Sequence, residues 1–253
     1  LFSPDLSLSI MDVPGELRLE RLPTNTTAAN HPIHRWFNFI AGFSPELVDI
    51  ICDRLSATET PQLVLDPFAG CGTAPITAAL RGVRAIGYEA HPVFERICRA
   101  KLVSPESIHN LAHIKTALEQ GLATPVPLDT LPEAPRLFLQ KLFPPEALEQ
   151  LLGMRASLDA HALNDNDLAF LLLSKTLDLS SHSATDGIYK APTTTKNNCS
   201  PALALKKALH TISSDLCYLG ERDLSQLARI YGKSSENMSE VNDQTVSVIV
   251  TSP

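Results

Sequence analysis

Short apolar runs and helix-like apolar spacing alternate near the start of the chain. Residues 63–65 form a strand-like apolar run that ends at Asp66. A glycine-containing turn follows, and residues 73–80 then have the pattern of a helix that Gly82 ends in the left-handed conformation. Residues 84–88 form a second strand-like run, which is followed by another acidic residue. Two strands joined by a helix in this way predict a parallel sheet.

A helix is also expected before this unit. Ser44 can accept hydrogen bonds from the free N–H groups of a first turn, Pro45 suits that turn, and Glu46 complements the helix dipole. The lead-in at residues 1–30 is polar and rich in Pro, Thr and Asn, so we expect irregular structure there.

Helical periodicity dominates the middle of the chain. Four helices are expected, at residues 105–121, 145–160, 166–178 and 201–219. The polar stretch at residues 180–200 is rich in Ser, Thr and Asn and predicts a long loop. Two strands then follow, at residues 228–231 and 246–250.

These elements predict an α/β fold, with a doubly wound and mostly parallel sheet that is incomplete in this chain. We divide the chain into three parts. Residues 1–103 contain the N-terminal helix and the strand–helix–strand unit, residues 104–225 form a helical insertion, and residues 226–253 return to the sheet.

Composition narrows the class of protein. The 253 residues are 44% hydrophobic and 19% charged, as in globular proteins. No apolar run is long enough for a membrane span, and five cysteines without a CxxC pair favour a reducing cytoplasm. We expect no metal site, because His109 and His113, one helical turn apart, lack further ligands. The net charge of −7 argues mildly against a nucleic-acid partner.

The turn after the first strand carries the most informative chemistry. Asp66 ends the strand, and Gly70 and Gly72 allow a ligand to approach the backbone closely. Asp66 would repel a pyrophosphate, and Pro75 stands where the third glycine of a dinucleotide fingerprint belongs. A positively charged ligand fits the acid instead, and S-adenosylmethionine carries both a sulfonium and an ammonium group.

A second acid, Glu89, lies at the end of the next strand, 19 residues after Gly70. A carboxylate at this place can accept hydrogen bonds from both hydroxyls of a ribose. The alternative is that Asp66 only caps the helix and the glycines only form a tight turn. The two acids together favour a cofactor site.

The string DPFAGCGT at residues 66–73 resembles the first motif of the exocyclic-amine (N4-cytosine and N6-adenine) DNA methyltransferases and of their RNA-modifying relatives. The resemblance implies a class I methyltransferase fold, Rossmann-like in type, with S-adenosylmethionine as cofactor. Residues 89–92 resemble the second motif, and residues 31–37 resemble an N-terminal element that leans over the methionine end of the donor. Residues 228–235 resemble the third motif, with Lys233 where an acid is expected. The cofactor-binding residues implied are Asp66, Pro67, Phe68, Ala69, Gly70, Gly72, Thr73, Glu89, Ala90 and Ser234.

The last residues resemble the start of the fourth motif, a strand followed by Ser, Asn or Asp, two prolines and an aromatic residue. The catalytic residues that this implies are Thr251, Ser252 and Pro253. A side-chain oxygen and a proline carbonyl accept the two hydrogens of a target amine and turn its lone pair toward the methyl group. The second proline and the aromatic residue are not in this chain, so we expect the fragment to be inactive alone. The alternative is that Thr-Ser-Pro forms an ordinary turn.

Several substrates and one different class of protein stay open. Ser252 favours cytosine-N4 methylation of DNA over adenine-N6 methylation, in a restriction–modification or orphan enzyme. The absence of a Pro-Cys pair argues against the cysteine-dependent C5 reaction. An RNA or tRNA base amine is the first alternative, and DNA is favoured because no separate RNA-binding domain is evident. A non-catalytic S-adenosylmethionine-binding module is the second alternative.

The spacing between the motifs is long, with 186 residues from Asp66 to Ser252. Residues 104–225 therefore form an insertion, whose simplest role is packing against the core. Its other role would be to bind the target nucleic acid through residues 180–200. The lysines available for phosphate contacts are Lys190, Lys196, Lys206 and Lys207. The family's strand order places the strand at 246–250 beside the one at 62–66, with an open apolar edge.

Overall fold

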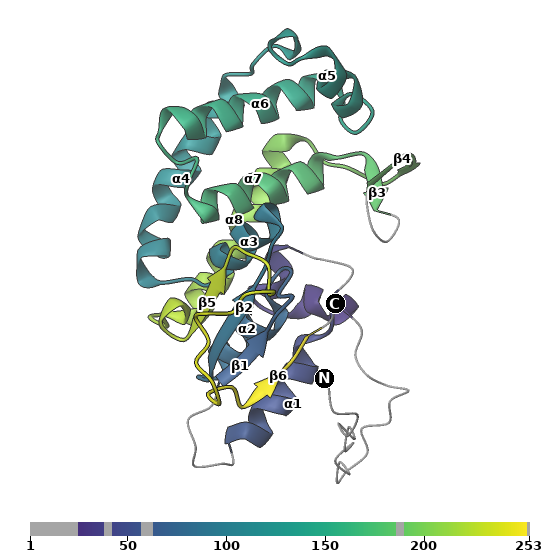
Figure 1. The fold of residues 1–253 in the computed structure, drawn as a ribbon. Helices are drawn as coiled ribbons and strands as arrows, with labels where there is room; N and C mark the ends of the chain where they lie inside the picture. Colours follow the sequence, from purple (N-terminus) through teal and green to yellow (C-terminus); the bar gives the residue numbers. More distant parts are fainter. Residues whose placement is uncertain (1–24, 38–41, 57–62, 186–189, 252–253) are drawn as a thin grey trace.

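The computed structural model describes residues 25–37, 42–56, 63–185 and 190–251. Ser252, Pro253 and most of the lead-in at residues 1–30 lie outside the described residues. Figure 1 shows a small sheet with flanking helices and, adjoining it, a block of longer helices. Within the described ranges, no helix is both long and apolar enough to cross a membrane.

The described residues form one sheet of four parallel strands, in the order β5–β2–β1–β6 (Figure 1). The strands are β1 (Leu63–Asp66), β2 (Arg84–Tyr88), β5 (Ala228–Tyr231) and β6 (Val248–Ile249). The expected α/β fold with a parallel sheet is therefore confirmed. The chain steps outward from β1 to β2 and β5, and then returns to β6 on the other side of β1. In sheets of this kind, ligands bind at the carboxyl ends of the strands where the order reverses.

β6 pairs with β1 as expected but is shorter than the strand predicted at residues 246–250. At its start, the Leu63 N–H donates to the Ser247 hydroxyl at 3.2 Å, where a backbone carbonyl would otherwise accept. The regular ladder therefore begins one residue later. β6 is an edge strand of the described sheet, and Ile249 is 59% exposed.

Three helices accompany the strands in sequence: α1 (Pro45–Ser56), α2 (Thr73–Leu80) and α3 (Pro92–Lys101). α2 packs on β1 and β2, and α1 packs on α2. α1 begins at Pro45 as expected, but the Ser44 hydroxyl is buried without a hydrogen-bond partner among the described residues. The expected side-chain cap is therefore wrong. Gly82 follows α2 with a φ of 75°, as predicted for its left-handed end.

α3 was not among the expected helices. His91 caps its start by accepting the Val93 N–H on Nδ1 at 3.3 Å, and Pro92 occupies the first turn. Imidazole is not one of the usual capping groups. A search of the sequence for Ser, Thr, Asp or Asn therefore misses this helix start.

The block of longer helices follows α3. It consists of α4 (Pro105–Ala123), α5 (Glu133–Leu139), α6 (Pro145–Ala160), α7 (Asp167–Ser180) and α8 (Pro201–Leu219). The four helices expected here are confirmed, and the short α5 is additional. α5 buries none of its residues, so it has no apolar periodicity to reveal it. α4 packs on α6, α7 packs on α8, and α7 also contacts α3.

The long loop predicted at residues 180–200 is wrong in its middle. β3 (Ser183–Thr185) and β4 (Lys190–Thr195) form an antiparallel hairpin that projects from the block in Figure 1. The run of threonines in β4 explains the difference, because β-branched residues favour extended structure although they are polar. The same composition had indicated a loop.

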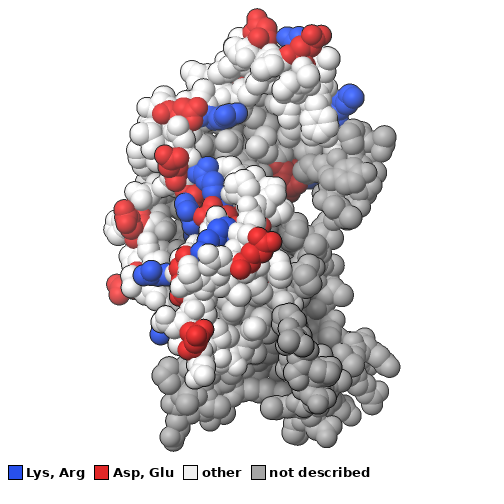
Figure 2. Space-filling view, viewed as in Figure 1, with Lys and Arg blue, Asp and Glu red and all other residues white. Residues whose placement is uncertain are grey.

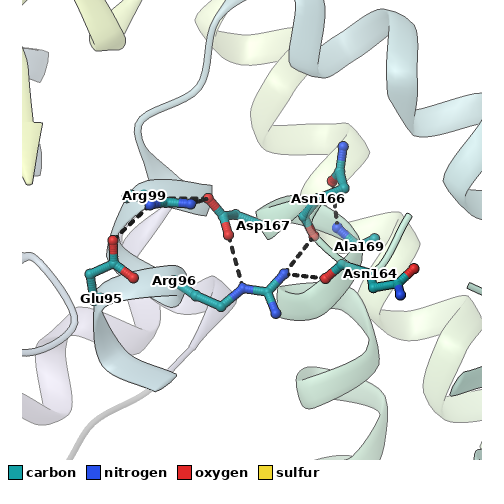
Figure 3. Close-up of polar contacts among 7 residues, drawn as sticks. All are labelled: Glu95, Arg96, Arg99, Asn164, Asn166, Asp167 and Ala169. Carbon is teal, nitrogen blue, oxygen red and sulfur yellow. Dashed lines mark hydrogen bonds and ion pairs between the residues drawn. The ribbon is translucent and has the colours of Figure 1, made fainter. Parts of the chain in front are cut away.

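Asp167, at the start of α7, ties the block to α3 (Figure 3). Its two oxygens accept hydrogen bonds from Arg96 Nε at 3.0 Å and from Arg99 Nε at 2.8 Å. Arg96 also donates to the Asn164 carbonyl at 2.6 Å, and its guanidinium lies 4.3 Å from the centre of the Phe170 ring. This contact joins the first residues of α7 to the helix that follows β2.

Two glycines bring the backbones of α4 and α6 into contact. A Cβ atom on Gly153 would lie 2.3 Å from the Gly121 carbonyl oxygen and 2.4 Å from the Thr124 carbonyl oxygen. A Cβ atom on Gly121 would lie 2.4 Å from the Met154 Cα. Backbone atoms cannot move aside as a flexible side chain can, so glycine is required at both positions.

We expect Gly153→Ala to destabilise the protein by about 1–3 kcal/mol, since overpacking has this cost. The sign of this change in stability is diagnostic, because Gly-to-Ala changes at unstrained helix positions stabilise a protein. Urea unfolding measures the effect, with Gln120→Ala on the exposed face of α4 as the control. A Gly153→Ala variant as stable as the unchanged protein would contradict the close contact of the two helices.

Candidate ligand site at the carboxyl end of the sheet

The turn between β1 and α2 lies at the carboxyl end of the sheet and is fixed by backbone hydrogen bonds. The Ala69 N–H donates to the Tyr88 carbonyl of β2 at 2.8 Å, and the Gly72 N–H donates to the Ala69 carbonyl at 2.7 Å. Gly70 and Gly72 have φ values of 52° and 88°, in the region that favours glycine. A Cβ atom on Gly72 would lie 2.3 Å from the Cys98 sulfur. Glycine is therefore required at position 72, both for its positive φ and for the lack of space beside it.

Asp66 is an acid buried at the end of β1. Its side chain is 1% exposed, Oδ1 accepts the Phe68 N–H at 3.1 Å, and Oδ2 has no hydrogen-bond partner among the described residues. Burial raises the pKa of Asp66 to about 6 and the charge of Glu89 adds to this rise, while the Thr251 hydroxyl and the Phe68 N–H oppose it. No described cation is among the groups that shift this pKa. A buried acid of this kind suits a cationic ligand.

Glu89 connects the glycine turn to the end of β2. Its Oε2 accepts the Gly70 N–H at 2.8 Å, and its Oε1 accepts the His91 N–H at 2.7 Å. This structural role was not predicted from the sequence. Each carboxylate oxygen has two lone pairs, so both can accept a further hydrogen bond from a ligand.

Thr251 lies two residues after the end of the edge strand β6, on the opposite side of β1 from Glu89. Its hydroxyl is close enough to Asp66 to lower the pKa of that acid. The structure therefore brings together the predicted residues of the first, second and fourth motifs at the point where the strand order reverses. Ser252 and Pro253 lie outside the described residues.

The remaining predicted residues lie in this turn, at its ends, after β2 or after β5. Phe68 is 53% exposed, which is unusual for an aromatic side chain, and Thr73 begins α2. Pro67 is half-buried and Ala90 is exposed. The exposed Ser234 accepts the Glu236 N–H at 3.2 Å, so it stabilises a turn after β5.

Lys233, which stands where the resembled motif has an acid, is paired with an acid from the following loop. Its Nζ lies 2.7 Å from Glu240 Oε1, and the Tyr88 hydroxyl donates to Glu240 Oε2 at 3.0 Å. The hydrogen bond from Lys233 lowers the pKa of Glu240. Glu240 is therefore an acid near the end of β2 that the motif comparison did not identify.

Lys101 was also missed by the sequence reading, although it lies directly beneath the turn. This lysine at the end of α3 is 2% exposed, and its Nζ donates to the Cys71 carbonyl at 3.1 Å and to the Phe37 carbonyl at 3.2 Å. Burial lowers its pKa. The signal in the sequence was weak, because a single lysine at the end of a helix usually faces solvent.

The two histidines excluded as a metal site serve other contacts. His109 Nδ1 lies 2.8 Å from the Pro105 carbonyl oxygen, and the ring of His113 meets that of His161 edge-on at 5.7 Å. Among the described residues, no group of three or more metal-ligating side chains occurs.

The pKa of Asp66 predicts a pH dependence of stability. The folded-state pKa, about 6, is above the unfolded value of 3.8, so the folded protein binds more protons between these pH values. Stability from this group is therefore present below pH 4 and lost as the pH rises through 6. The difference between the two pKa values corresponds to about 3 kcal/mol in the free energy of unfolding.

We expect Asp66→Asn to be more stable than the unchanged protein at pH 7 and similar to it at pH 4, in the absence of ligand. Urea unfolding at a series of pH values measures the difference. Asp159→Asn, which removes an exposed acid on α6, controls for the loss of one charge. A difference between Asp66→Asn and the unchanged protein that does not vary with pH would show that Asp66 is ionised as readily as an exposed acid.

Comparison with known proteins gives one partial match. A stretch of 64 residues, 25% of this chain, is 36% identical to type II methyltransferase M.BsoBI of Geobacillus stearothermophilus. The match spans 12% of that protein's length. No protein-family model matches the chain, and no solved structure matches it. The chain thus has a distant and partial similarity to a type II methyltransferase.

Proposed function

We propose that this chain carries the donor site of an S-adenosylmethionine-dependent methyltransferase that modifies an exocyclic amine of a DNA base. The observation that carries the proposal is the buried Asp66, whose pKa is raised and for which no described cation is among the groups that shift the pKa. It adjoins a glycine turn and a second acid at the point where the strand order reverses. The partial similarity to a type II methyltransferase supports the same reading.

The residues present fit the donor. The Oδ2 of Asp66, which has no hydrogen-bond partner among the described residues, is an acceptor for its positively charged methionine end. Glu89 retains lone pairs for the ribose hydroxyls while it holds the turn. The exposed ring of Phe68 offers an apolar surface. When bound, S-adenosylmethionine supplies an electrophilic methyl group.

The acceptor side of the proposal rests on Thr251, Ser252 and Pro253. Ser252 and the Pro253 carbonyl would accept the two hydrogens of the target amine, which directs its lone pair toward the donor. Thr251, whose hydroxyl lowers the pKa of Asp66, directly precedes these residues in the sequence. A base in a duplex must first leave the stack to reach this position. Ser252 favours the N4 amine of cytosine over the N6 amine of adenine.

The electrostatics do not single out a nucleic-acid surface. Figure 2 shows acidic and basic side chains side by side on one face of the molecule rather than a basic stripe. Lys196, a proposed phosphate contact, donates to the Asp178 carbonyl at 2.7 Å and lies 3.3 Å from its carboxylate. Lys206 borders an apolar groove between α4 and α8. DNA is favoured over RNA through the similarity to the type II enzyme.

Donor binding tests the first half of the proposal. We expect Asp66→Asn and Glu89→Gln each to weaken the binding of S-adenosylhomocysteine by about 10- to 100-fold, since each removes a charge-assisted hydrogen bond. Calorimetry measures the affinity. Asp49→Asn is the matched control, because burial also raises the pKa of that acid although it lies on α1 and faces Arg81. Equal affinity in all four proteins would remove the basis for the assignment.

The pH dependence of donor affinity tests the role of Asp66 more directly. A cationic ligand favours the ionised acid, so S-adenosylmethionine affinity should fall as the pH drops below about 6. The decrease should approach about tenfold per pH unit, and it should be absent in Asp66→Asn. An affinity that stays constant between pH 7 and pH 5 in the unchanged protein would place the cation elsewhere.

Methyl transfer by the complete protein tests the substrate. Transfer of a tritiated methyl group to DNA but not to tRNA, with N4-methylcytosine in the digested product, is the expected result. Ser252→Ala should retain donor binding and lose transfer. Labelling of tRNA alone would favour the RNA alternative, and donor binding without transfer to either would favour the non-catalytic module.

A further inference from the structure

A short segment before α1, residues 33–37, is held by a buried carboxylate from the block of longer helices. Asp215 of α8 is 1% exposed. Its Oδ2 accepts the Ile33 N–H at 2.9 Å and the Trp36 Nε1–H at 2.8 Å. Arg35 donates to both carboxylate oxygens, with its Nε at 3.1 Å from Oδ2. One side chain thus fixes three residues that are about 180 positions away in the sequence.

This arrangement is costly to build, which argues against an incidental contact. A buried carboxylate loses its hydration, and well-packed apolar residues often stabilise a fold as well as a buried ion pair does. Ile33 has a φ of 66°, which is a strained conformation for a β-branched residue. Strained backbone of this kind tends to occur where a functional site requires it.

Contacts of residues 33–37 link α8 to α2 and, through Lys101, to the glycine turn. His34 Nε2 lies 3.1 Å from the Thr77 hydroxyl, in the middle of α2. Three residues later, the Phe37 carbonyl accepts a hydrogen bond from Lys101 Nζ, and the same ammonium group binds the Cys71 carbonyl of the turn. The segment therefore runs along α2 toward the end where the turn begins.

A second lysine, this one from the block of longer helices, also contacts residues 33–37. Lys175 of α7 donates from Nζ to the Arg35 carbonyl at 3.3 Å. Burial lowers the pKa values of both Lys101 and Lys175. Charged side chains from α3, α7 and α8 thus converge on five residues that border the turn.

We propose that Asp215 is a positioning residue for the methyl donor, because it fixes residues 33–37 against α2 and the glycine turn. The proposal rests on the proposed function and extends it. The block of longer helices then has a role in donor binding that is separate from any contact with nucleic acid. Asp215 acts through Trp36, Arg35 and Ile33, and not by touching the donor.

Trp36 serves as a built-in fluorescence probe of this segment, because it is the only tryptophan in the 253-residue sequence. It is fully buried and bonded to Asp215, so its emission reports on this segment alone. We expect Asp215→Asn to shift the Trp36 emission to the red. We also expect it to weaken S-adenosylhomocysteine binding by about tenfold or more, within the range for coupling through packed networks.

Asp167→Asn is the matched control. It removes another carboxylate that joins the block to the core through arginines (Figure 3), at a place away from residues 33–37. A merely structural role predicts that the two variants lose affinity only in step with lost stability. The positioning role predicts that Asp167→Asn keeps the Trp36 emission and the affinity of the unchanged protein.

A second pair of variants serves if Asp215→Asn does not fold. Arg35→Ala removes the ion pair but leaves the Ile33 and Trp36 bonds to Asp215, and Arg35→Lys keeps a cation beside it. Weaker donor binding in Arg35→Ala with recovery in Arg35→Lys supports the proposal. Unchanged affinity in folded Asp215→Asn or in Arg35→Ala overturns it. Absence of binding in the unchanged protein would instead reject the proposed function itself.

Discussion

The candidate site depends on a carboxyl group that the fold removes from water, and no described cation is among the groups that shift its pKa. Asp66 is 1% exposed at the end of β1, and its Oδ2 has no hydrogen-bond partner among the described residues. Ionising such a group costs free energy, which a bound cation offsets. The turn beside it is fixed in shape, because Gly70 and Gly72 adopt positive φ values and Glu89 accepts the Gly70 N–H. The raised pKa of Asp66 lowers the stability of the folded protein above pH 6, and reduced stability of this kind is common at functional sites.

The topology places Glu89 and Thr251 on opposite sides of that carboxyl group. β2, with Glu89 at its end, pairs with one edge of β1, and β6, followed by Thr251, pairs with the other. The chain crosses from one side to the other only after the block of longer helices and β5. Residues that are far apart in the sequence therefore meet around Asp66, and the side with Glu89 suits a donor while the side with Thr251 suits an acceptor.

The elements that the sequence predicted well are those in which local pattern and tertiary environment agree. β1 and α2 are mostly buried and β2 is buried except at its start, so their residues are mainly apolar, and α8 begins with a Ser cap followed by proline. α3 was missed because a histidine caps it, and the β3–β4 hairpin was missed because its residues are polar. In both cases, the residue types are not those that usually mark the structure that forms.

The site could be predicted where its residues stand in a recognisable motif, as at residues 66–73, Glu89 and Thr251. The turn at residues 66–73 and Glu89 are recognisable from spacing, since strand ends and glycines mark them in one short stretch. Lys101 and Asp215 carry no such mark, because each is a single charged residue on an amphipathic helix. Their importance comes from partners that only the folded chain brings near them. No periodicity in the sequence separates a buried charge of this kind from an exposed one.

The way the block of longer helices joins the sheet explains how it can support the site without disturbing it. The Leu224 N–H donates to the Val103 carbonyl at 2.9 Å, so the chain leaves and re-enters the sheet region at nearly the same place. Apolar packing of α7 on α3 and the Asp167 contact would suffice to hold the block there. Asp215 goes beyond this need, because its partners belong to the segment beside the glycine turn and not to the sheet. A carboxylate buried at that cost fits the proposed role of Asp215 in placing residues 33–37, by which the block would contribute to the proposed donor site.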